Sequence, residues 1–249
     1  MAMPRSARRK SESGIYHIML RGINRQQIFE DEEDRQRFTE TLFHYQAVCG
    51  YRIYGYCLMG NHIHLLLKEG KEDLTLILKR VAGSYVYWYN WKYRRSGHLF
   101  QDRFKSEPVD DDGYFLTVLR YIHQNPVKAG ICRRVEDYPH SSYCSYFTDD
   151  GLVDVGFALS MLPLEEFVSY HKQLSTDRCL EVEESIRLND EDAKAILFKI
   201  SRCRSASDFQ RLPVEKRNKH IEKLHKRGLS IRQISRLTGI PKKTVEDNI

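Results

Sequence analysis

The chain has 249 residues, 41% of them hydrophobic, and a formal net charge of +6. This length suits one large domain or two small ones, and the apolar fraction is compatible with a real core. No apolar stretch approaches the roughly 20 residues that span a bilayer, and no signal-peptide core follows the basic N-terminal residues. We therefore expect a cytoplasmic protein.

The first half of the chain predicts an alternation of strands and helices. Alternating apolar residues predict strands, and apolar residues at helical spacing predict helices. Gly60 and Asn61 form a two-residue turn signal, so the strands on either side of them should pair antiparallel. Pro126 is expected to end the third helix. The predicted elements are a flexible basic arm over residues 1–13, strands over 14–21, 51–59 and 62–68, helices over 31–49, 74–93 and 110–125, and an edge strand within 100–107.

This order of elements is close to the split β-α-β layout of ferredoxin-like domains. We therefore expect an α+β domain over residues 1–175, with an RRM-like antiparallel sheet that carries helices on one face. A helix over residues 157–173 is expected to close this domain. An acidic helical linker over residues 176–200 and an all-α basic tail over residues 201–249 should follow.

Two histidines, His62 and His64, lie one residue apart in a predicted strand. Alternate side chains of a strand share a face, so both imidazoles should project to one side while Ile63 points into the core. Two neutral imidazoles on a rigid strand can supply two ligands to a divalent metal ion. The alternative is a half-buried pair that faces solvent or joins a hydrogen-bond network.

Tyr121 and Asn125 lie four residues apart in a predicted helix, and therefore one turn apart on one face. The amide oxygen of Asn125 can serve as a third metal ligand, although asparagine before proline is also a common helix terminator. Tyr121 would then lie one turn from the metal. Its alternative is a core aromatic residue with the hydroxyl at the rim.

These four residues suit nucleophilic attack on a phosphodiester. Two imidazoles and an amide are neutral, so a bound divalent ion would keep its full positive charge for a scissile phosphate. A phenol with an ordinary pKa near 10 becomes a better nucleophile as that pKa falls or as a base takes its proton. Oxygen and imidazole ligands with open positions favour Mg²⁺ or Mn²⁺.

At these residues the chain resembles a known family. The segment Asn61-His62-Ile63-His64 is similar to the histidine-hydrophobic-histidine motif of the HUH single-strand nucleases. Residues 121–130 resemble the tyrosine helix of the IS200/IS605-like single-tyrosine (Y1) transposases, in particular their REP-associated branch. The resemblance covers roughly residues 4–172, and supporting matches lie at Tyr16-His17 and within residues 21–25, 97–105 and 141–143.

The resemblance implies metal-dependent cleavage and rejoining of single-stranded DNA, often at hairpin-forming repeats, for DNA transposition. It implies a transient 5′-phosphotyrosine at Tyr121 and a free 3′-OH. It also implies association with the bacterial nucleoid, and it leaves a monomer and a homodimer open. Gly60 departs from the family pattern, which often has proline before the Asn-His pair, but glycine still permits the turn.

Four basic residues are candidate phosphate contacts, although each can equally be an ordinary surface charge. They are Arg21, Arg25, Arg103 and Lys105. The aromatic residues between Tyr85 and Tyr93 can stack unpaired bases, but their helical spacing favours packing in the core. His17 on the first strand either borders the site or has a structural role, and the structural role is favoured. His123 should face away from Tyr121 on its helix.

The last 49 residues carry thirteen basic and five acidic side chains, whereas residues 149–200 carry twelve acidic and five basic ones. Ser230 can cap a short helix, Gly239 can make a turn, and Pro241 suits the first turn of another helix. This pattern predicts a helix-turn-helix that binds duplex DNA, with Lys242, Lys243 and Thr244 at the start of the recognition helix. The alternative is a small helical oligomerisation hairpin.

Two other functions compete with the transposase prediction. One is a non-catalytic DNA-binding regulator that keeps the fold, and the other is a metal-dependent phosphodiesterase that uses water. The six cysteines contain no Cys-x-x-Cys pair, which argues against a zinc ribbon and against a disulfide scaffold.

Overall fold

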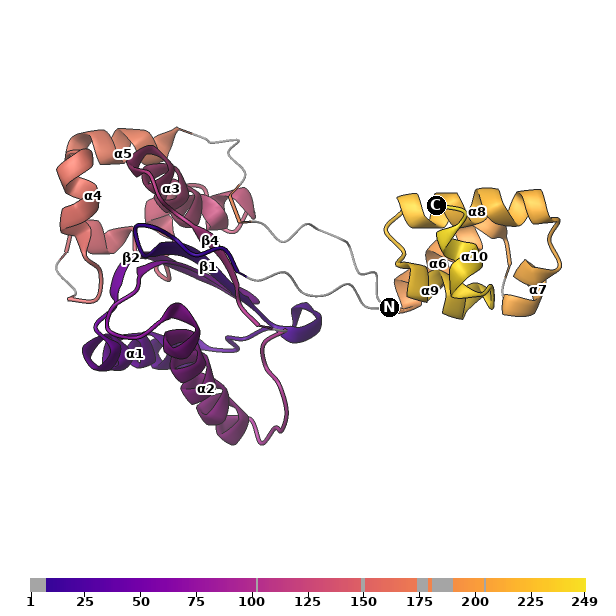
Figure 1. Cartoon of the computed structure of the whole chain (residues 1–249), viewed down its shortest axis with the longest axis horizontal. Coiled ribbons are helices and arrows are strands. Elements are labelled where there is room, and N and C mark those ends of the chain that lie inside the picture. Colours follow the sequence, from indigo (N-terminus) through magenta and orange to yellow (C-terminus); the bar gives the residue numbers. More distant parts are fainter. Residues whose placement is uncertain (1–7, 102, 149–150, 174–178, 181–189, 204) are drawn as a thin grey trace. The chain divides into compact units, whose positions relative to one another are not determined.

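The computed structural model describes residues 8–101, 103–148, 151–173, 179–180, 190–203 and 205–249 (Figure 1). The chain divides into two compact units, residues 1–180 and residues 181–249, and each is described by itself. Within the described ranges, no helix has both the length and the apolar character needed to cross a membrane. Residues 1–7 of the predicted basic arm lie outside the described residues.

The first unit is built on a four-stranded antiparallel sheet with the order β2-β3-β1-β4. The strands are β1 (Ile15–Arg21), β2 (Arg52–Met59), β3 (His62–Lys68) and β4 (Lys105–Pro108). The turn at Gly60 and Asn61 joins β2 to β3, and β4 lies at the edge beside β1. The predicted hairpin and edge strand are therefore confirmed.

Two helices cover one face of the sheet: α1 (Glu32–Cys49) and α2 (Leu74–Lys92) (Figure 1). The side chain of Asp31 caps α1 by accepting a hydrogen bond from the backbone N–H of Asp34, and Gly50 ends the helix in the left-handed region at φ 70°. The core on this face combines alternate strand residues with aromatic residues of both helices. Its members include Ile18, Leu20, Phe38, Leu42, Ile63, Leu65 and Tyr85.

A third helix, α3 (Asp112–Lys128), packs on the second face of the sheet. The expectation of helices on one face only is therefore corrected, while the antiparallel sheet with helices is confirmed. The physical reason is that β2 and β3 are buried on both faces, and such a sheet needs cover on both sides. This second core joins Val118, Leu119 and Ile122 of α3 to Cys57 and Leu66 of the sheet.

Pro126 does not end α3, contrary to expectation, because the helix continues to Lys128. A proline inside a helix removes one backbone N–H, here the donor for the carbonyl of Ile122. The last turn is held by later bonds, such as that from the N–H of Ala129 to the carbonyl of Asn125 at 2.9 Å. The chain leaves the helix at Gly130, which adopts φ 69°.

The remaining elements of the first unit are short. They are the 3₁₀ turns η1 (Ile23–Arg25), η2 (Val135–Asp137) and η3 (Cys144–Tyr146) and the helices α4 (Val155–Met161) and α5 (Leu164–Lys172). The single helix predicted over residues 157–173 is thus two helices. The break lies at Leu162 and Pro163, because the residue before a proline is pushed out of the helical region.

The second unit is all-α, as predicted, and has its own core. Its helices are α6 (Asp190–Ser201), α7 (Ala206–Gln210), α8 (Val214–Lys226), α9 (Ile231–Thr238) and α10 (Lys242–Glu246). α6 up to residue 200 falls within the range predicted as a linker, yet it contributes Ala193 and Leu197 to this core. Of the earlier linker residues, 176–178 and 181–189 lie outside the described residues, and Cys179 is buried in the second core of the first unit.

Candidate active site on the sheet

His62 and His64 lie on the sheet face that α3 covers. Their ring centroids are 5.1 Å apart, and Ile63 between them lies in the core on the opposite face. The alternation of a strand produces this arrangement, as the sequence predicts. His62 is half-buried at the start of β3, whereas His64 is only 2% exposed.

The imidazole of His62 is oriented by Asn61. Nδ1 of His62 lies 2.7 Å from Oδ1 of Asn61, and the amide nitrogen of Asn61 donates to the carbonyl of Arg25 at 3.4 Å. The amide oxygen can only accept, so the proton of a neutral His62 is on Nδ1. Its Nε2 lone pair is therefore available to a metal ion.

The imidazole of His64 is held by His17, for which a structural role was expected. Nε2 of His17 lies 3.0 Å from Nδ1 of His64, and His17 is fully buried on β1. Nδ1 of His17 lies 3.9 Å from a carboxylate oxygen of Glu107, its register partner on β4, and the Tyr114 hydroxyl also contacts Glu107. Within the sequence, only the match at Tyr16-His17 pointed towards this residue.

Burial keeps all three imidazoles neutral near pH 7. It lowers the pKa of His62 to about 4 and that of His17 to about 3, and it lowers the pKa of His64 well below its ordinary value. The positive charge of Arg21 further lowers the pKa of His62. Metal binding requires a neutral imidazole, so these shifts fit a metal site.

Tyr121 of α3 lies against the same histidines. Its ring centroid is 5.7 Å from that of His64 and 5.8 Å from that of His17, and both contacts are edge-on. The ammonium group of Lys128 lies 4.5 Å from the centre of the Tyr121 ring. Sequence reasoning missed Lys128, although a separation of seven residues places it on the same helix face as Tyr121.

Asn125 lies one turn after Tyr121, as its spacing predicts. Its amide nitrogen donates to the backbone carbonyl of Tyr121 at 2.8 Å, and the residue is half-buried. That bond leaves the amide oxygen for another partner. Because α3 runs on to Lys128, the alternative role of Asn125 as a helix terminator does not apply.

The four candidate phosphate contacts come from different segments of the first unit. Arg21 is the register partner of His62 across β1 and β3. Lys105 is exposed on β4, two residues before Glu107, so the two side chains share a face of the sheet. Arg25 is half-buried in η1, and Arg103 is exposed in the loop before β4.

His123 faces away from the site, as predicted. Its Nδ1 lies 2.9 Å from Nε2 of His171, and its Nε2 lies 2.8 Å from the hydroxyl of Ser142. The same hydroxyl accepts a hydrogen bond from the backbone N–H of Tyr56 at 2.7 Å. This buried network ties α3 to α5 and to the edge strand β2.

The residues at the histidine pair fit a divalent ion that takes two imidazole nitrogens and oxygen ligands. Both imidazoles use Nδ1 for protein contacts, which leaves Nε2 for an ion. Among the residues that the structure describes, no group of three His, Cys, Asp or Glu side chains is arranged to hold a metal. A site here would therefore need an amide or other oxygen besides the two histidines.

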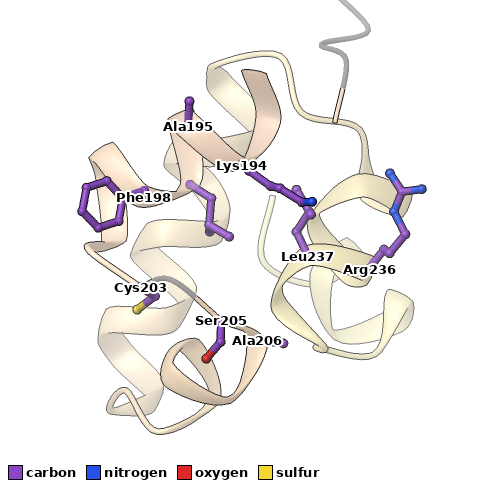
Figure 2. Close-up of a pocket in the computed structure, with 9 residues that line it drawn as sticks. Lys194, Ala195, Phe198, Cys203, Ser205, Ala206, Arg236 and Leu237 are labelled. Atoms are coloured by element: carbon purple, nitrogen blue, oxygen red, sulfur yellow. The ribbon is translucent and has the colours of Figure 1, made fainter. Parts of the chain in front are cut away.

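The second unit contains the predicted pair of short helices. Ser230 and Gln233 form a capping box at the start of α9, and Gly239 ends that helix at φ 68°. Lys242, Lys243 and Thr244 are exposed at the start of α10, which has only five residues. A hollow of about 540 Å³ lies between α6, α7 and α9, and its apolar lining is edged by Lys194 and Arg236 (Figure 2). Lys242, Lys243 and Thr244 do not line this hollow.

Comparison with known proteins gives the family. The model of the family described as "Transposase IS200 like" matches residues 10–125. A Haemophilus influenzae protein named among the REP-associated tyrosine transposases is 30% identical over 123 residues, which are 45% of this chain and 67% of that protein. The chain belongs to the IS200-like transposase family, in its REP-associated tyrosine branch.

The fold of this transposase-family chain agrees with that assignment. The solved structure of a REP-associated tyrosine transposase bound to a REP hairpin matches it with a TM-score of 0.52 and 18% identity. The match covers 61% of this chain and 90% of that one. At this identity the match supports the fold, and the chemistry rests on the residues described above.

Proposed function

We propose that this transposase-family protein cleaves and rejoins single-stranded DNA through a covalent link to Tyr121, with the help of a divalent metal ion. The observation that carries the proposal is the position of the Tyr121 ring, 5.7 Å from that of His64 and on the same side of the sheet. A nucleophile and a pair of metal-competent imidazoles thus come together from α3 and β3.

His62, His64 and Asn125 would hold the ion, through two Nε2 atoms and one amide oxygen. Mg²⁺ or Mn²⁺ suits such ligands and, when bound, would polarise the scissile phosphate and offset its developing charge. His17 is a positioning residue, because its contact with Nδ1 of His64 leaves Nε2 of that ring for the ion.

The phenol oxygen of Tyr121 attacks the phosphorus atom and forms a phosphotyrosine bond, while the bond from phosphorus to the 3′-oxygen of the preceding nucleotide breaks. The phenol loses its proton, and the released 3′-oxygen gains one. The ammonium group of Lys128 favours the phenolate form of Tyr121 because it lies over the ring. Attack of a 3′-OH on the phosphotyrosine reverses the step and rejoins the strand without a nucleotide cofactor.

The DNA partner is proposed to be a hairpin with a single-stranded flank. The similar solved structure is bound to a REP hairpin, which supports this choice. Arg21, Arg25, Arg103 and Lys105 would contact phosphates, and Arg21 is the closest of them to His62 in the strand register. In the second unit, Lys242, Lys243 and Thr244 would contact duplex DNA from the start of α10.

The test is a denaturing gel of the protein mixed with a labelled hairpin oligonucleotide that carries single-stranded flanks, with Mn²⁺ or with chelator. The expected result is a covalent protein–DNA species that requires Mn²⁺ and disappears in Tyr121→Phe. Tyr138→Phe is the matched control, because it removes the hydroxyl of another buried tyrosine, which donates to the carbonyl of Leu58. This control should form the adduct.

The two competing functions predict other results in the same assay. A non-catalytic regulator would bind the hairpin regardless of chelator and would form no adduct. A phosphodiesterase that uses water would release ordinary hydrolysis products, again without an adduct, and Tyr121→Phe would remain active. Either result would overturn the proposal.

A further inference from the structure

Two aromatic side chains of α2 lie almost entirely in solvent. Tyr87 is 78% exposed and Trp91 is 73% exposed, and their separation of four residues places them on one face of the helix. Gly83 lies one turn earlier on the same face, and nothing lies within 4 Å of the position that its Cβ would take. The face is therefore broad, aromatic and accessible.

The exposed pair is not needed to hold α2 in place. Tyr85 and Tyr89 are buried on the opposite side of the helix, and their hydroxyls bind the carbonyl of Ile28 and the carboxylate of Glu30. The aromatic residues between Tyr85 and Tyr93 thus include a buried set and an exposed set. Tyr85 and Tyr89 pack in the core, whereas Tyr87 and Trp91 are exposed and available to bind a partner.

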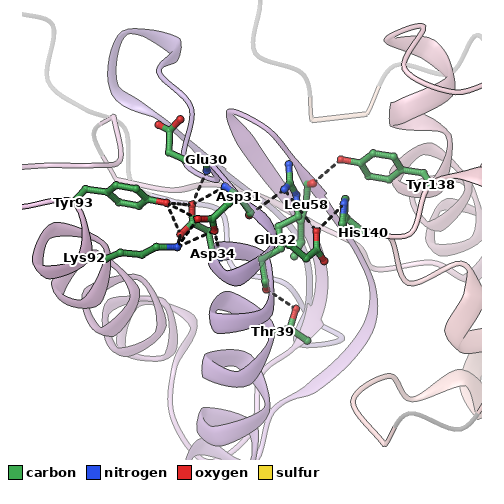
Figure 3. A network of polar contacts seen from close by, with 11 residues as sticks. Glu30, Asp31, Glu32, Asp34, Thr39, Leu58, Lys92, Tyr93, Tyr138 and His140 are labelled. Carbon is green, nitrogen blue, oxygen red and sulfur yellow. Dashed lines mark hydrogen bonds and ion pairs between the residues drawn. The ribbon is translucent and has the colours of Figure 1, made fainter.

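The C-terminal end of α2 is also anchored by charge. The ammonium group of Lys92 lies 2.8 to 2.9 Å from carboxylate oxygens of Asp31 and Asp34, and the hydroxyl of Tyr93 donates to Asp34 (Figure 3). The same ammonium group lies 2.8 Å from a carboxylate oxygen of Glu33. These contacts neutralise part of the acidic start of α1. These acidic side chains at the start of α1 are therefore paired with Lys92.

A continuous set of contacts joins this end of α2 to the candidate active site. Arg95 donates to the side-chain oxygen of Gln26 at 3.3 Å, at the end of η1. The preceding residue, Arg25, accepts the amide of Asn61 through its carbonyl, and Asn61 in turn holds His62. Residues 22–27 thus contact both the segment that follows α2 and the turn that holds His62.

Two arginines follow the last turn of α2. Arg94 is exposed, and the guanidinium of Arg95 lies 5.5 Å from the centre of the ring of Tyr89, which belongs to the buried set. Exposed aromatic rings with cations nearby are the usual platform for unpaired bases. Cations at this position would not favour the binding of an apolar protein partner.

We propose that Tyr87 and Trp91 form a stacking platform for unpaired bases of the single-stranded DNA that flanks the cleaved phosphate. Because α2 and Tyr121 lie on opposite faces of the sheet, the DNA passes around the sheet past residues 22–27, and Arg94 contacts its backbone. This inference rests on the proposed function, and it identifies which part of the substrate α2 holds.

The chain contains two tryptophans, Trp88 and Trp91, so the variant Trp88→Phe leaves Trp91 as the only one. Titration of this variant with oligothymidylate should give saturable quenching of its fluorescence, because a stacked base contacts the indole. An oligonucleotide with the same phosphates but abasic sugars should not quench. The complementary variant Trp91→Phe, which keeps half-buried Trp88, should also show little quenching.

Binding affinity gives a second measurement. Trp91→Ala and Tyr87→Ala should each weaken binding of single-stranded DNA by about 5- to 150-fold, the equivalent of one lost stacking contact. Phe43→Ala is the matched control, because Phe43 is an aromatic residue of α1 with 55% exposure. Its affinity should equal that of the unaltered protein.

The platform and the covalent chemistry can fail separately. At saturating DNA, Trp91→Ala should still form the Tyr121 adduct, so absence of the adduct in every variant would overturn the proposed function alone. Unchanged affinity in both alanine variants, with no quenching of Trp91, would overturn the platform. A loss of dimer mass in Trp91→Ala with unchanged DNA affinity would also overturn it, since the occupant would then be a second copy of the chain.

Discussion

Nε2 of His17 lies 3.0 Å from Nδ1 of His64, deep inside the first unit. The other nitrogen of His17, Nδ1, lies 3.9 Å from a carboxylate oxygen of Glu107, which is too far for a hydrogen bond. A metal ion on Nε2 of His64 requires the tautomer of His64 that carries its proton on Nδ1. Nε2 of His17 is placed to accept that proton and so to support this tautomer.

His17→Ala should therefore weaken Mn²⁺ binding by about 10- to 100-fold, the usual effect of losing a group that orients a metal ligand. Isothermal titration calorimetry measures this affinity directly, and near-UV circular dichroism checks that the variant is folded. His44→Ala, which alters an exposed histidine of α1, should bind Mn²⁺ normally. Unchanged affinity in His17→Ala would show that His17 only fills the core.

Asn125 should act through its amide oxygen. Asn125→Ala removes that oxygen and should lower Mn²⁺ affinity by at least about 10-fold, whereas Asn125→Asp keeps an oxygen ligand and should retain binding. Both variants lose the bond from the amide nitrogen to the carbonyl of Tyr121, so their difference isolates the oxygen. Equal Mn²⁺ affinity in the two variants would remove Asn125 from the metal site.

The buried histidines outside the site predict how stability depends on pH. Burial lowers the pKa of His171 to about 4 and lowers that of His123 well below its ordinary value. Above pH 6.5 both are neutral in the folded and unfolded chain. As pH falls below 6.5 the unfolded chain binds protons that the folded chain cannot, so each such histidine lowers the free energy of unfolding by about 1.4 kcal/mol per pH unit.

Urea unfolding followed between pH 7.5 and pH 5 measures this slope. In His171→Gln the slope should be smaller by about 1.4 kcal/mol per pH unit, because one depressed titration is gone. His44→Ala, which alters an exposed histidine of α1, is the control and should keep the slope of the unaltered protein. An unchanged slope in His171→Gln would mean that His171 binds its proton at an ordinary pH in the folded chain.

The second unit makes a separate prediction about duplex DNA. Replacing Lys242 and Lys243 together by alanine should weaken duplex binding across all sequences and reduce the salt dependence of the affinity by about two phosphate contacts. Fluorescence anisotropy at several salt concentrations measures both effects. Replacing Lys216 and Lys223 together by alanine, which removes two exposed lysines of α8, serves as the control for net charge. A salt dependence equal to that of the control would exclude α10 as a duplex contact.

The elements that sequence reasoning predicts well are those with local causes. The turn at Gly60 and Asn61 and the alternation through His62, Ile63 and His64 depend on neighbouring residues, and the structure has them as expected. The spacing of Tyr121 and Asn125 likewise needs only a helix. His62, His64, Tyr121 and Asn125 could therefore be predicted as candidates without knowledge of the sheet.

Lys128 was missed although its helical spacing from Tyr121 is a local signal. The other missed contacts depend on strand register and on packing between distant segments. His17 meets His64 only because β1 pairs with β3 in one register, and no local pattern sets that register. The sequence does contain one indication that a helix covers the second face of the sheet, and this is Gly55. A Cβ at Gly55 would lie 2.6 Å from Leu119 of α3, and a glycine inside a strand often marks such a close approach.

The central claim is that Tyr121 becomes covalently linked to DNA, and mass spectrometry of the adduct tests it most directly. Trypsin cleaves after Arg120 and Lys128, which releases residues 121–128 with Tyr121 as the single tyrosine. After reaction with hairpin DNA and Mn²⁺ and trimming of the DNA by nuclease, this peptide should carry the mass of a 5′-linked nucleotide. Cleaved DNA with an unmodified 121–128 peptide, or a nucleotide on another tyrosine, would contradict the account.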